Sequence, residues 1–393
     1  MFGLEALLCV LIQTSGRWNI FGWMYILKKF EIPKVINSLE HENLMLSVCM
    51  QCGTCSASCT SRQSFNLRKL ILNLNLTGND LSDSIWDCTT CLTCQTRCPR
   101  GIPLTEIIVD SRKEFVETGR IPSEIRDMLD SIYKHKNPFG EGKYKRKKFI
   151  EDIKKKFDVS DISEYYWFIG CVSSYESRSM EVVEKTARIF KDIGIDFSVD
   201  ADEGCCGNEA MVLGEEGLFE LLKEENEMFF KERGVEKVIA SSPHCYNAFK
   251  KYYGLEVLTP VEVIYKAIKE GTLEFKYDVD ARVTYHDPCY LGRYNGIYDA
   301  PREVIKSVYN VEFVEMQRIR ENSYCCGGGS GNFLRESRAN VQRVREALST
   351  NADILVVSCP ICLIMLEDAV KTLNSDLAVM DVVELVHLAM YGY

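Results

Sequence analysis

The sequence lacks the features that mark several common classes of protein. After the first thirty residues, no apolar run is long enough to span a bilayer, which takes about 20 residues. No Gly-x-Gly-x-x-Gly run follows an expected strand, so we predict no nicotinamide or flavin site. A Cys-x-x-Cys-His motif for haem attachment is missing as well. Positive charge is not in excess, and the net charge of −10 argues against a general nucleic-acid binder.

Cysteine, in contrast, is abundant, with 18 residues in a chain of 393. A chain of this length can build apolar cores and does not need a disulfide framework to fold. In an enzyme-sized chain without a convincing secretory signal, cysteines at short fixed spacings more often bind metal or carry out redox chemistry. We therefore expect a protein of the reducing cytoplasm.

Residues 1–44 allow two interpretations. The run Leu4–Ile12 is apolar, but it is too short to span a bilayer and lacks the leading positive charges of a secretory signal. The aromatic run Trp18–Phe30 follows. This extension either contacts a membrane surface or a partner, or it precedes the true start codon. Cys9 has no partner group within it and is expected to pack or to belong to a leader.

Two cysteine runs share one spacing, Cys-x2-Cys-x2-Cys-x3-Cys, and a proline follows the second. This doubled spacing is typical of two-cluster ferredoxins, in which three close thiolates and one from the other run hold each [4Fe–4S] cluster. Two zinc sites are the alternative, but zinc sites close on four ligands and seldom interleave eight. The predicted ligands are Cys49, Cys52, Cys55 and Cys98 for one cluster, and Cys88, Cys91, Cys94 and Cys59 for the other.

Helices are expected between and after these runs, at Phe65–Leu76 and Leu104–Val116. Residues 45–120 are therefore predicted to form an all-helical ferredoxin module. Residues 121–162 contain a basic, solvated run and are predicted to be a helical linker. If the run has a function, it would attract an anionic partner or substrate.

The chain then repeats itself, and we call residues 163–278 the first repeat and residues 279–393 the second repeat. Three cysteine motifs recur at offsets of 117 to 120 residues. Each repeat alternates strand-length apolar runs with amphipathic stretches, which predicts a parallel sheet covered by helices, an α/β fold. Cysteines that follow strands should lie at the carboxyl edge of such a sheet. The expected helices are Glu176–Ile193, Glu215–Arg233, Pro301–Tyr309 and Leu334–Ser349.

The second repeat offers five thiols from three loops. Four ligands satisfy a zinc ion or a cubane, so five indicate an enlarged iron–sulfur cluster. Adjacent cysteines cannot easily close a disulfide without strain, but each can bind a different iron. The glycines at 327–329 have no Cβ to obstruct a close approach. A phosphate loop is the other reading of these glycines, but no Lys-Ser or Lys-Thr follows them. The five thiols are Cys289, Cys325, Cys326, Cys359 and Cys362.

The pattern C…CCG…CxxC, repeated behind two ferredoxin runs, resembles the D-type catalytic iron–sulfur subunit of the heterodisulfide reductases of methanogenic archaea. More broadly, it is similar to the cysteine-rich CCG-domain oxidoreductases. The resemblance covers nearly the whole chain from about residue 45. It implies a helical ferredoxin module joined to two CCG domains, in which each complete motif binds a noncubane [4Fe–4S] cluster. It also implies that the disulfide of coenzyme M and coenzyme B is cleaved between two such clusters, so the five cysteines of the second repeat would be catalytic.

The first repeat departs from this pattern. Ser242 stands where the family has the first cysteine of its CxxC. Serine is a poor replacement because its alkoxide forms far less readily than a thiolate. We expect this site to hold an altered cluster, a zinc ion or a cluster with one exchangeable position. The matching cysteines are Cys171, Cys205, Cys206 and Cys245.

Several other side chains near the cysteines have two readings. His286 or Asp287 could protonate a leaving thiolate, since cleavage of a disulfide consumes two electrons and two protons. Alternatively, Asp287 and the following proline begin a helix. His244 could hydrogen-bond to cluster sulfur or transfer a proton. Arg293 and Arg335 are expected in surface salt bridges, and would otherwise meet an anionic substrate.

These features predict an iron–sulfur oxidoreductase subunit that passes single electrons inward and reduces a small-molecule disulfide. Its electrons would come from a membrane cytochrome b-type or flavoprotein subunit, and it would lie on the cytoplasmic membrane face through that partner. Nucleic acid is not an expected partner. Two alternatives remain: an electron-transfer subunit of a lactate- or glycolate-type dehydrogenase or of a membrane sulfur-metabolism complex, and a zinc-containing redox sensor or scaffold.

Overall fold

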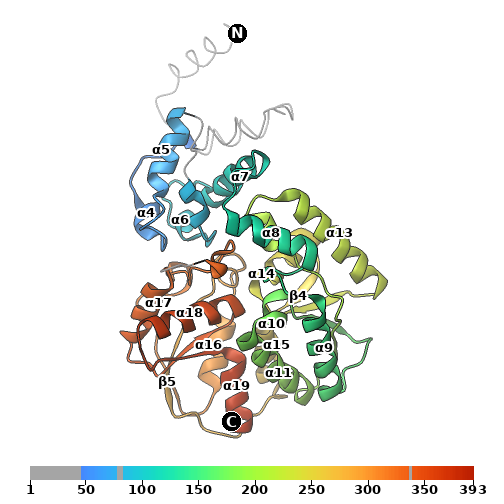
Figure 1. Ribbon diagram of the computed structural model, residues 1–393. Coiled ribbons are helices and arrows are strands. Elements are labelled where there is room, and N and C mark those ends of the chain that lie inside the picture. The colour runs from blue at the N-terminus through green and yellow to red at the C-terminus, as the bar shows by residue number, and fades with distance from the viewer. Residues whose placement is uncertain (1–45, 78–82, 336–338) are drawn as a thin grey trace, which may run out of the picture. The chain divides into compact units, whose positions relative to one another are not determined.

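The computed structural model describes residues 46–77, 83–335 and 339–393 of the chain. It separates into two units, Met1–Cys49 and Met50–Tyr393. The predictions for residues 1–44 lie outside the described residues. The architecture below is that of the second unit (Figure 1).

The ferredoxin module is helical, as predicted. Its cysteine-bearing turns are short helices, and each begins after a residue in the left-handed conformation, Gly53 (φ 79°) and Leu92 (φ 63°). The longer α5 packs against α4, and α7 packs against α6. The elements, with the 3-10 helix η1, are α4 (Thr54–Ser58), α5 (Leu67–Thr77), η1 (Asp83–Asp87), α6 (Thr93–Thr96), α7 (Leu104–Glu117) and α8 (Ser123–His135).

The basic run between the module and the first repeat forms helix α9 (Lys143–Phe157). Most of its lysines are exposed, as expected for a solvated run. Its apolar side chains Phe149, Ile150 and Ile153 are buried in the core that contains Trp167 of the first repeat. This helix therefore contributes to the core of the first repeat as well as connecting it to the module.

Each repeat contains a four-stranded parallel sheet, with strand order β2-β1-β3-β4 in the first and β6-β5-β7-β8 in the second. The identical order confirms the prediction of two tandem α/β domains. The first repeat contains β1 (Tyr165–Phe168), α10 (Cys171–Tyr175), α11 (Ser177–Asp192), β2 (Phe197–Ser198), α12 (Asn208–Val212), α13 (Glu216–Glu232), β3 (Lys237–Ala240), α14 (Pro243–Ala248), the π-helical turn η2 (Phe249–Tyr253), β4 (Glu256–Leu258) and α15 (Pro260–Glu270).

The second repeat follows the same plan. Its last predicted helix does not include Leu334, because residues 332–334 form a separate 3-10 helix, and the described part of the helix is Ala339–Leu348. Its elements are β5 (Ala281–Tyr285), α16 (Asp299–Ser307), β6 (Val311–Phe313), η3 (Arg320–Asn322), η4 (Asn332–Leu334), α17 (Ala339–Leu348), β7 (Ile354–Val357), α18 (Pro360–Thr372), β8 (Ala378–Asp381) and α19 (Val382–Tyr391).

The two repeats share an apolar core. Ile189 of α11 and Ile264 of α15 are fully buried together with Ile305 of α16 and Leu385 of α19. Burial of this kind stabilises a fold by about 25 cal/mol for each Å² of apolar surface removed from water. The repeats are therefore held against each other, and their cysteine-bearing loops meet beside the ferredoxin module.

Candidate iron–sulfur sites

The five cysteines of the second repeat lie together at the carboxyl ends of its strands. Cys289 follows β5, the Cys325–Cys326 pair follows β6, and Cys359 and Cys362 follow β7. All five side chains are buried. The Sγ atoms of Cys362 and Cys326 are 3.3 Å apart. Hydrogen bonds also join Cys325 to both Cys289 and Cys326. The structure therefore brings the whole predicted set into one cluster of thiols.

The glycine run after Cys325–Cys326 allows close packing on both sides. A Cβ on Gly328 would lie 2.5 Å from Cγ2 of Ile361, and one on Gly329 would lie 2.3 Å from the backbone oxygen of Thr89. Gly327 has φ +90°, a conformation that L residues with side chains rarely adopt. The run is thus fixed by contact with α18 on one side and with the ferredoxin module on the other.

The ferredoxin module contacts this thiol cluster directly. A side-chain hydrogen bond joins Cys91 to Cys325, and Thr89 donates its hydroxyl to Cys325 Sγ at 3.6 Å. Arg293 donates to the backbone oxygens of Cys91 and Ser323. Arg293 is therefore partly buried at this contact and bonded to backbone oxygens, and the prediction of a surface salt bridge for it was wrong.

Arg335 does form a salt bridge, with Asp87 at 3.5 Å, and it also donates to the backbone oxygen of Trp86. Both partners belong to η1 of the ferredoxin module. Arg335 thus ties the second repeat to the module beside the cysteine-bearing turns.

Within the module, the electrostatics place one cysteine of the first run, Cys59, near the second run. Burial raises the pKa of Cys59 far above its usual value, and the charges of Cys88 and Cys91 raise it further, which places Cys59 beside the second run. Burial, followed by the charges of neighbouring cysteines that include Cys59 and Cys55, likewise raises the pKa of Cys94.

The remaining module cysteines are less enclosed. Cys52 is exposed, and its Sγ lies 3.3 Å from the hydroxyl of Thr54, which lowers its pKa. Cys98 follows α6, on which Cys94 lies. Cys49 belongs to the other unit, so its place in a ligand set remains a prediction.

The four matching cysteines of the first repeat also lie together. Hydrogen bonds join Cys171 to Cys205, Cys205 to Cys206, and Cys206 to Cys245. They line a small cavity of about 30 Å³, closed by residues that include Ile361 of the second repeat. The site is therefore a set of four thiols in a largely apolar enclosure.

Ser242 has a local structural role at the start of α14. Its hydroxyl accepts a hydrogen bond from the backbone N–H of His244 at 3.3 Å and so caps the helix. Cys359, at the equivalent position of the second repeat, caps α18 without a side-chain hydrogen bond. The substitution thus exchanges a free thiol for a helix cap.

His286 approaches the thiols of the second repeat. One of its ring nitrogens lies within 4.8 Å of Cys326 Sγ and Cys362 Sγ. Its Nδ1 accepts a hydrogen bond from Nε of Arg343 at 3.1 Å, and its Nε2 is buried with no hydrogen-bond partner. Burial, followed by the charge of Arg343, lowers the pKa of His286 well below its usual range. The ring is therefore neutral, and its hydrogen is on Nε2.

His244 belongs to the first repeat but contacts the second. It makes a side-chain hydrogen bond to Cys359, and its Nδ1 lies 2.8 Å from Oε1 of Glu209. Burial opposes the charged ring, but these two hydrogen bonds outweigh it and raise the pKa of His244 to about 10. Its ring also packs against that of Tyr290, with centroids 3.9 Å apart and planes tilted by 31°.

Asp287 does not begin a helix, so that prediction was wrong. Its carboxylate forms a bidentate ion pair with Arg302, with N···O distances of 2.6 and 3.0 Å, and accepts the backbone N–H of Arg320. Asp287 and Arg302 are both buried. This carboxylate is therefore fully engaged in holding α16 and the loop after β6.

Sequence reasoning missed Glu209, Arg343 and Thr89. A position-by-position comparison of the repeats could have found Glu209, because it corresponds to Gly329, as His244 corresponds to Ile361. Arg343 and Thr89 carry no such signal, since their partners lie far away in the sequence.

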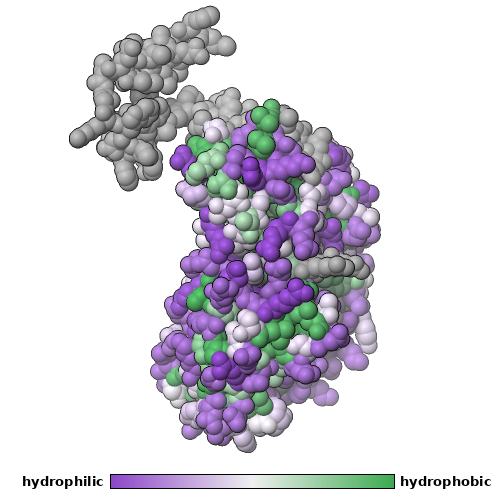
Figure 2. Space-filling view, turned by 90° about the vertical axis from the view of Figure 1, so that its left-hand side faces the viewer, coloured by the Kyte–Doolittle hydropathy of each residue, from purple (hydrophilic) through white to green (hydrophobic). Residues whose placement is uncertain are grey.

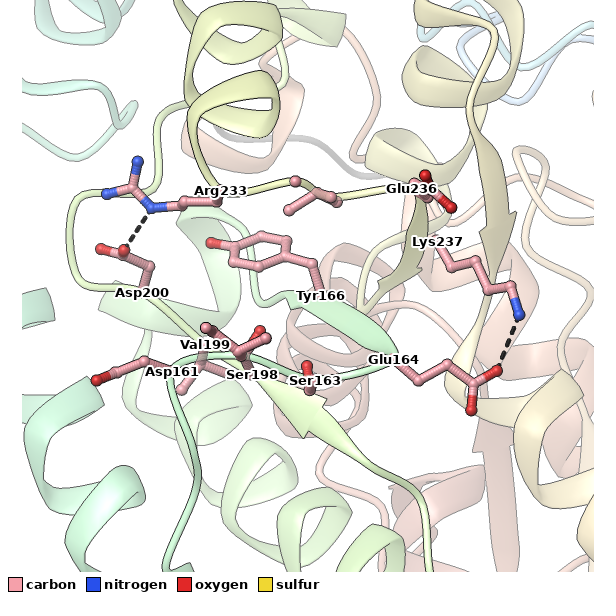
Figure 3. Close-up of a pocket in the computed structure, with 13 residues that line it drawn as sticks. Asp161, Ser163, Glu164, Tyr166, Ser198, Val199, Asp200, Arg233, Glu236 and Lys237 are labelled. Carbon is pink, nitrogen blue, oxygen red and sulfur yellow. Dashed lines mark hydrogen bonds and ion pairs between the residues drawn. The ribbon is translucent and has the colours of Figure 1, made fainter.

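A further cavity, of about 420 Å³, is lined by the segments that precede β1 and β3 and by residues 198–200 at the end of β2 (Figure 3). Two of its basic side chains are paired, Arg233 with Asp200 and Lys237 with Glu164. Those charges are therefore satisfied within the protein, and we assign the cavity no role.

The face shown in Figure 2 is mainly hydrophilic, with hydrophobic residues in small separate groups. Among the residues that the structure describes, no helix has both the length and the apolar character that a bilayer requires.

The residues present fit iron–sulfur clusters. Backbone N–H groups donate to two of the sulfurs, Thr90 to Cys88 at 3.4 Å and Gly327 to Cys325 at 3.3 Å, as hydrogen bonds to cluster sulfurs do. None of the cysteines in the described ranges forms a disulfide. Sets of thiols alone are the ligands that iron–sulfur clusters and zinc prefer.

Comparison with known protein families supports this assignment. The 4Fe-4S dicluster domain family matches residues 45–102, and the cysteine-rich domain (CCG) family matches residues 165–250 and 283–367. The fold and the thiol sets thus define an iron–sulfur protein with a dicluster module and two CCG domains.

The most similar individual proteins include named oxidoreductases. The chain is 34% identical to the "Probable iron-sulfur-binding oxidoreductase FadF" of Bacillus subtilis, over 81% of this chain and 48% of that protein. It is 32% identical to the "EtfAB:quinone oxidoreductase" of Syntrophomonas wolfei, over 79% of this chain and 47% of that protein. It therefore spans about half the length of these two relatives.

The chain is also 32% identical to the D-type subunit of the dihydromethanophenazine:CoB–CoM heterodisulfide reductase of Methanosarcina mazei, over 79% of both chains. The chain belongs to the family of CCG-domain iron–sulfur oxidoreductases that includes this heterodisulfide reductase subunit.

Proposed function

We propose that the protein is an electron-transferring subunit in which single electrons enter at the ferredoxin module and leave at the thiol site of the second repeat, where they reduce a disulfide of the CoM-S-S-CoB type. The contact between Cys91 of the module and Cys325 of the second repeat carries this proposal. Cys91 and Cys325 belong to the ligand sets predicted for two different clusters, so no layer of protein separates the sites.

Two further contacts support electron transfer between these two sites. Thr89 of the module donates a hydrogen bond to Cys325 Sγ. Gly329 packs against the backbone of Thr89 so closely that a side chain at position 329 would not fit. Because the contact is built from a glycine, the separation of the sites is set by the backbone. A defined, short separation is what electron transfer between two centres requires.

In this proposal, the two ferredoxin ligand sets hold [4Fe–4S] clusters, and the five cysteines of the second repeat hold a noncubane [4Fe–4S] cluster. Bound there, the clusters would supply one-electron reduction and an iron centre with affinity for sulfur. The first repeat would hold a cluster or a zinc ion on its four cysteines. Ser242 is not among those ligands, because its hydroxyl caps α14.

Reduction of a disulfide needs protons as well as electrons. One S–S bond breaks and two S–H bonds form, so R–S–S–R′ takes up two electrons and two protons. His286 holds a hydrogen on Nε2 beside Cys326 and Cys362, and Arg343 fixes that tautomer. Asp287 is committed to Arg302, and neutral His286 can donate a hydrogen bond but has no proton to release, so the two protons would come from solvent.

The electron donor would be another subunit, either a flavoprotein or a membrane cytochrome of the b type. The relatives suit either donor, since one is named for EtfAB and a quinone and another for dihydromethanophenazine. Docking on such a partner would place the protein on the cytoplasmic face of the membrane.

A second candidate function is electron relay to a partner that carries out the chemistry, as in a lactate- or glycolate-type dehydrogenase or a membrane sulfur-metabolism complex. The deep burial of all five thiols in the second repeat favours it. A relay takes up no protons and needs no access for a substrate. A zinc-containing sensor or scaffold is the third candidate.

Metal analysis and EPR of anaerobically purified protein test these functions. We expect roughly twelve or more irons per chain, from about four for each cluster, and an EPR signal of the oxidised protein that changes when a substrate thiol is added. A signal that no thiol perturbs would favour the relay. Iron confined to the ferredoxin module, or absent, would favour the zinc protein.

The matched variants are Cys326→Ala and Cys245→Ala. Cys326→Ala should lose the iron of the second repeat and all disulfide reduction, while the ferredoxin signals remain. Cys245→Ala should leave the signal of the second repeat in place. Full iron content and turnover in Cys326→Ala would overturn the proposal.

A further inference from the structure

We propose that His244 and Glu209 of the first repeat are positioning residues for the thiol site of the second repeat. This inference rests on the proposed function, since it requires a cluster on the five cysteines. It assigns to the first repeat a role beyond its own four thiols: supplying the hydrogen bond that orients and tunes Cys359.

The first observation is that the two repeats reach into each other's sites. Ile361, between the last two cysteines of the second repeat, lines the thiol cavity of the first. His244 occupies the equivalent position of the first repeat and hydrogen-bonds to Cys359 of the second. The contacts are reciprocal in position but not in chemistry. The first site receives an isoleucine, and the second receives a hydrogen-bonding ring.

The second observation is that Glu209 fixes His244. Its Oε1 lies 2.8 Å from Nδ1 of His244, and its Oε2 accepts the backbone N–H of Gly331 at 2.8 Å. Gly331 lies in the same loop as Cys325 and Cys326. One carboxylate thus joins the ring that contacts Cys359 to the loop that carries two other ligands.

The third observation is the confinement of the ring. His244 packs against Tyr290 with the two rings tilted by 31°, and Tyr290 stacks on Tyr294 at 4.3 Å with nearly parallel planes. Asn208 lies 3.3 Å from Nδ1 on the same side as Glu209. These neighbours leave the ring one orientation, with Nδ1 toward the carboxylate and Nε2 toward Cys359.

A role in packing alone does not explain this arrangement. At the equivalent position, the second repeat fills the space with Ile361, which needs no buried carboxylate. A buried histidine and a buried glutamate are costly unless each is hydrogen-bonded. Both departures, Glu209 in place of glycine and His244 in place of isoleucine, occur in the same repeat and contact each other. Ser242, in that same repeat, has lost the thiol. The first repeat thus differs from the five-thiol second repeat at three positions, and two of the differing side chains, Glu209 and His244, contact the second repeat.

The expected consequence is on the reduction potential of the second site. A hydrogen bond donated to a ligand sulfur stabilises the reduced, more electron-rich state and so raises the potential. Removing the ring should destabilise that state relative to the oxidised one.

The test is an EPR-monitored redox titration of the full chain with its clusters assembled, with iron counted in the same samples. We expect His244→Leu to keep its iron and to have a lower reduction potential at the second site. The expected shift is about tenfold in the oxidised-to-reduced ratio, which is 59 mV for a one-electron couple. Glu209→Gln should shift it in the same direction by less, because the ring stays but one of its anchors is lost. His387→Leu is the matched control, since His387 contacts the backbone of Tyr393 and should leave the potential unchanged.

The outcomes separate the two proposals. If Cys326→Ala keeps the full iron content, the proposed cluster is wrong and this inference falls with it. If Cys326→Ala loses the iron but His244→Leu and Glu209→Gln keep both iron and potential, only this inference is overturned. Selective loss of iron from the second site in both variants would support it, because residues of one repeat would then be needed to assemble the site of the other. Loss of the ferredoxin signals as well would show a general structural role and overturn it.

Discussion

Arg343 donates its Nε–H to Nδ1 of His286 at 3.1 Å, so a histidine of the thiol site is held by an arginine with no exposed surface. The same guanidinium pairs with Glu346 at 2.7 Å and donates to the backbone oxygen of Arg318. Arg343 thus has two tasks. It fixes the tautomer of His286, and it compensates a buried carboxylate of its own helix, α17.

The first prediction concerns this buried charge. Arg343→Met should lower the free energy of unfolding by about 3 kcal/mol, because removal of one partner leaves Glu346 buried and only partly compensated by Arg318. Anaerobic unfolding in guanidinium chloride measures this. Arg345→Met, on the exposed side of the same helix, should change stability by no more than about 0.5 kcal/mol. Equal losses in the two variants would contradict the prediction.

The second prediction concerns the contact between the ferredoxin module and the second repeat. Gly329→Ala would place a methyl group 2.3 Å from the backbone oxygen of Thr89, so one segment must move. We expect a loss of about 1–3 kcal/mol in stability and slower reduction of the second site by electrons from the module. Stopped-flow spectroscopy and unfolding measure the two effects.

Gly217→Ala is the control, because its Cβ would lie 3.5 Å from Oε1 of Glu215, an ordinary contact. Gly217 lies within helix α13, where alanine is preferred to glycine by about 1 kcal/mol. This variant should be as stable as the parent or more so, with unchanged electron transfer. Normal electron transfer in Gly329→Ala would show that this contact does not set the separation of the sites.

Much of this architecture could be predicted from sequence because cysteine spacing is a local signal. The ferredoxin runs, the strand-end position of each thiol group and the repeat at a nearly constant offset all follow from neighbours in the chain. The pairing of Asp287 with Arg302, and of Arg293 with the backbone of Cys91, could not be predicted. Periodicity shows which residues share an element, but not which loop of another domain will meet them.

For the same reason, the contacts of His244 and His286 could be predicted only in part. Both lie beside cysteines, so the sequence indicates that they belong to the sites. Which thiol each contacts depends on how the repeats pack, and His244 contacts the site of the other repeat. The tautomer of His286 depends on Arg343, and the two residues are 57 positions apart.

The third prediction concerns Ser242. Ser242→Ala should remove the cap of α14 and cost about 1 kcal/mol of stability, while the total metal content stays unchanged. Ser242→Asn is the matched variant, because asparagine caps as well as serine and should restore the stability. Thermal unfolding and metal analysis of the three proteins measure both quantities. A loss of metal in Ser242→Ala would show instead that the hydroxyl is a ligand.

The last prediction concerns the charges that join the two repeats. Arg178 of α11 forms ion pairs with Glu367 and Glu384 of the second repeat, each at 2.6 Å, and Lys185 contacts Glu384 as well. Burial favours the neutral form of Glu384, but the hydrogen bonds from Arg178 and Lys185 outweigh it and hold its pKa below the usual 4.5. A carboxyl whose pKa is lower in the folded state stabilises the fold at pH values above its unfolded pKa. That stabilisation is lost as the pH falls through the folded pKa.

Arg178→Met should therefore cost about 2 kcal/mol near neutral pH, where Glu384 is ionised and keeps only Lys185. The difference from the parent protein should shrink as the pH falls below about 4.5, because protonation of Glu384 removes the interaction in both proteins. Arg188→Met, on the same helix and hydrogen-bonded to Tyr393, should show a smaller cost. Unfolding measured from pH 7 down to values well below pH 4 gives both curves, and a difference that stays constant over that range would assign the stabilisation to packing of the Arg178 side chain instead of its charge.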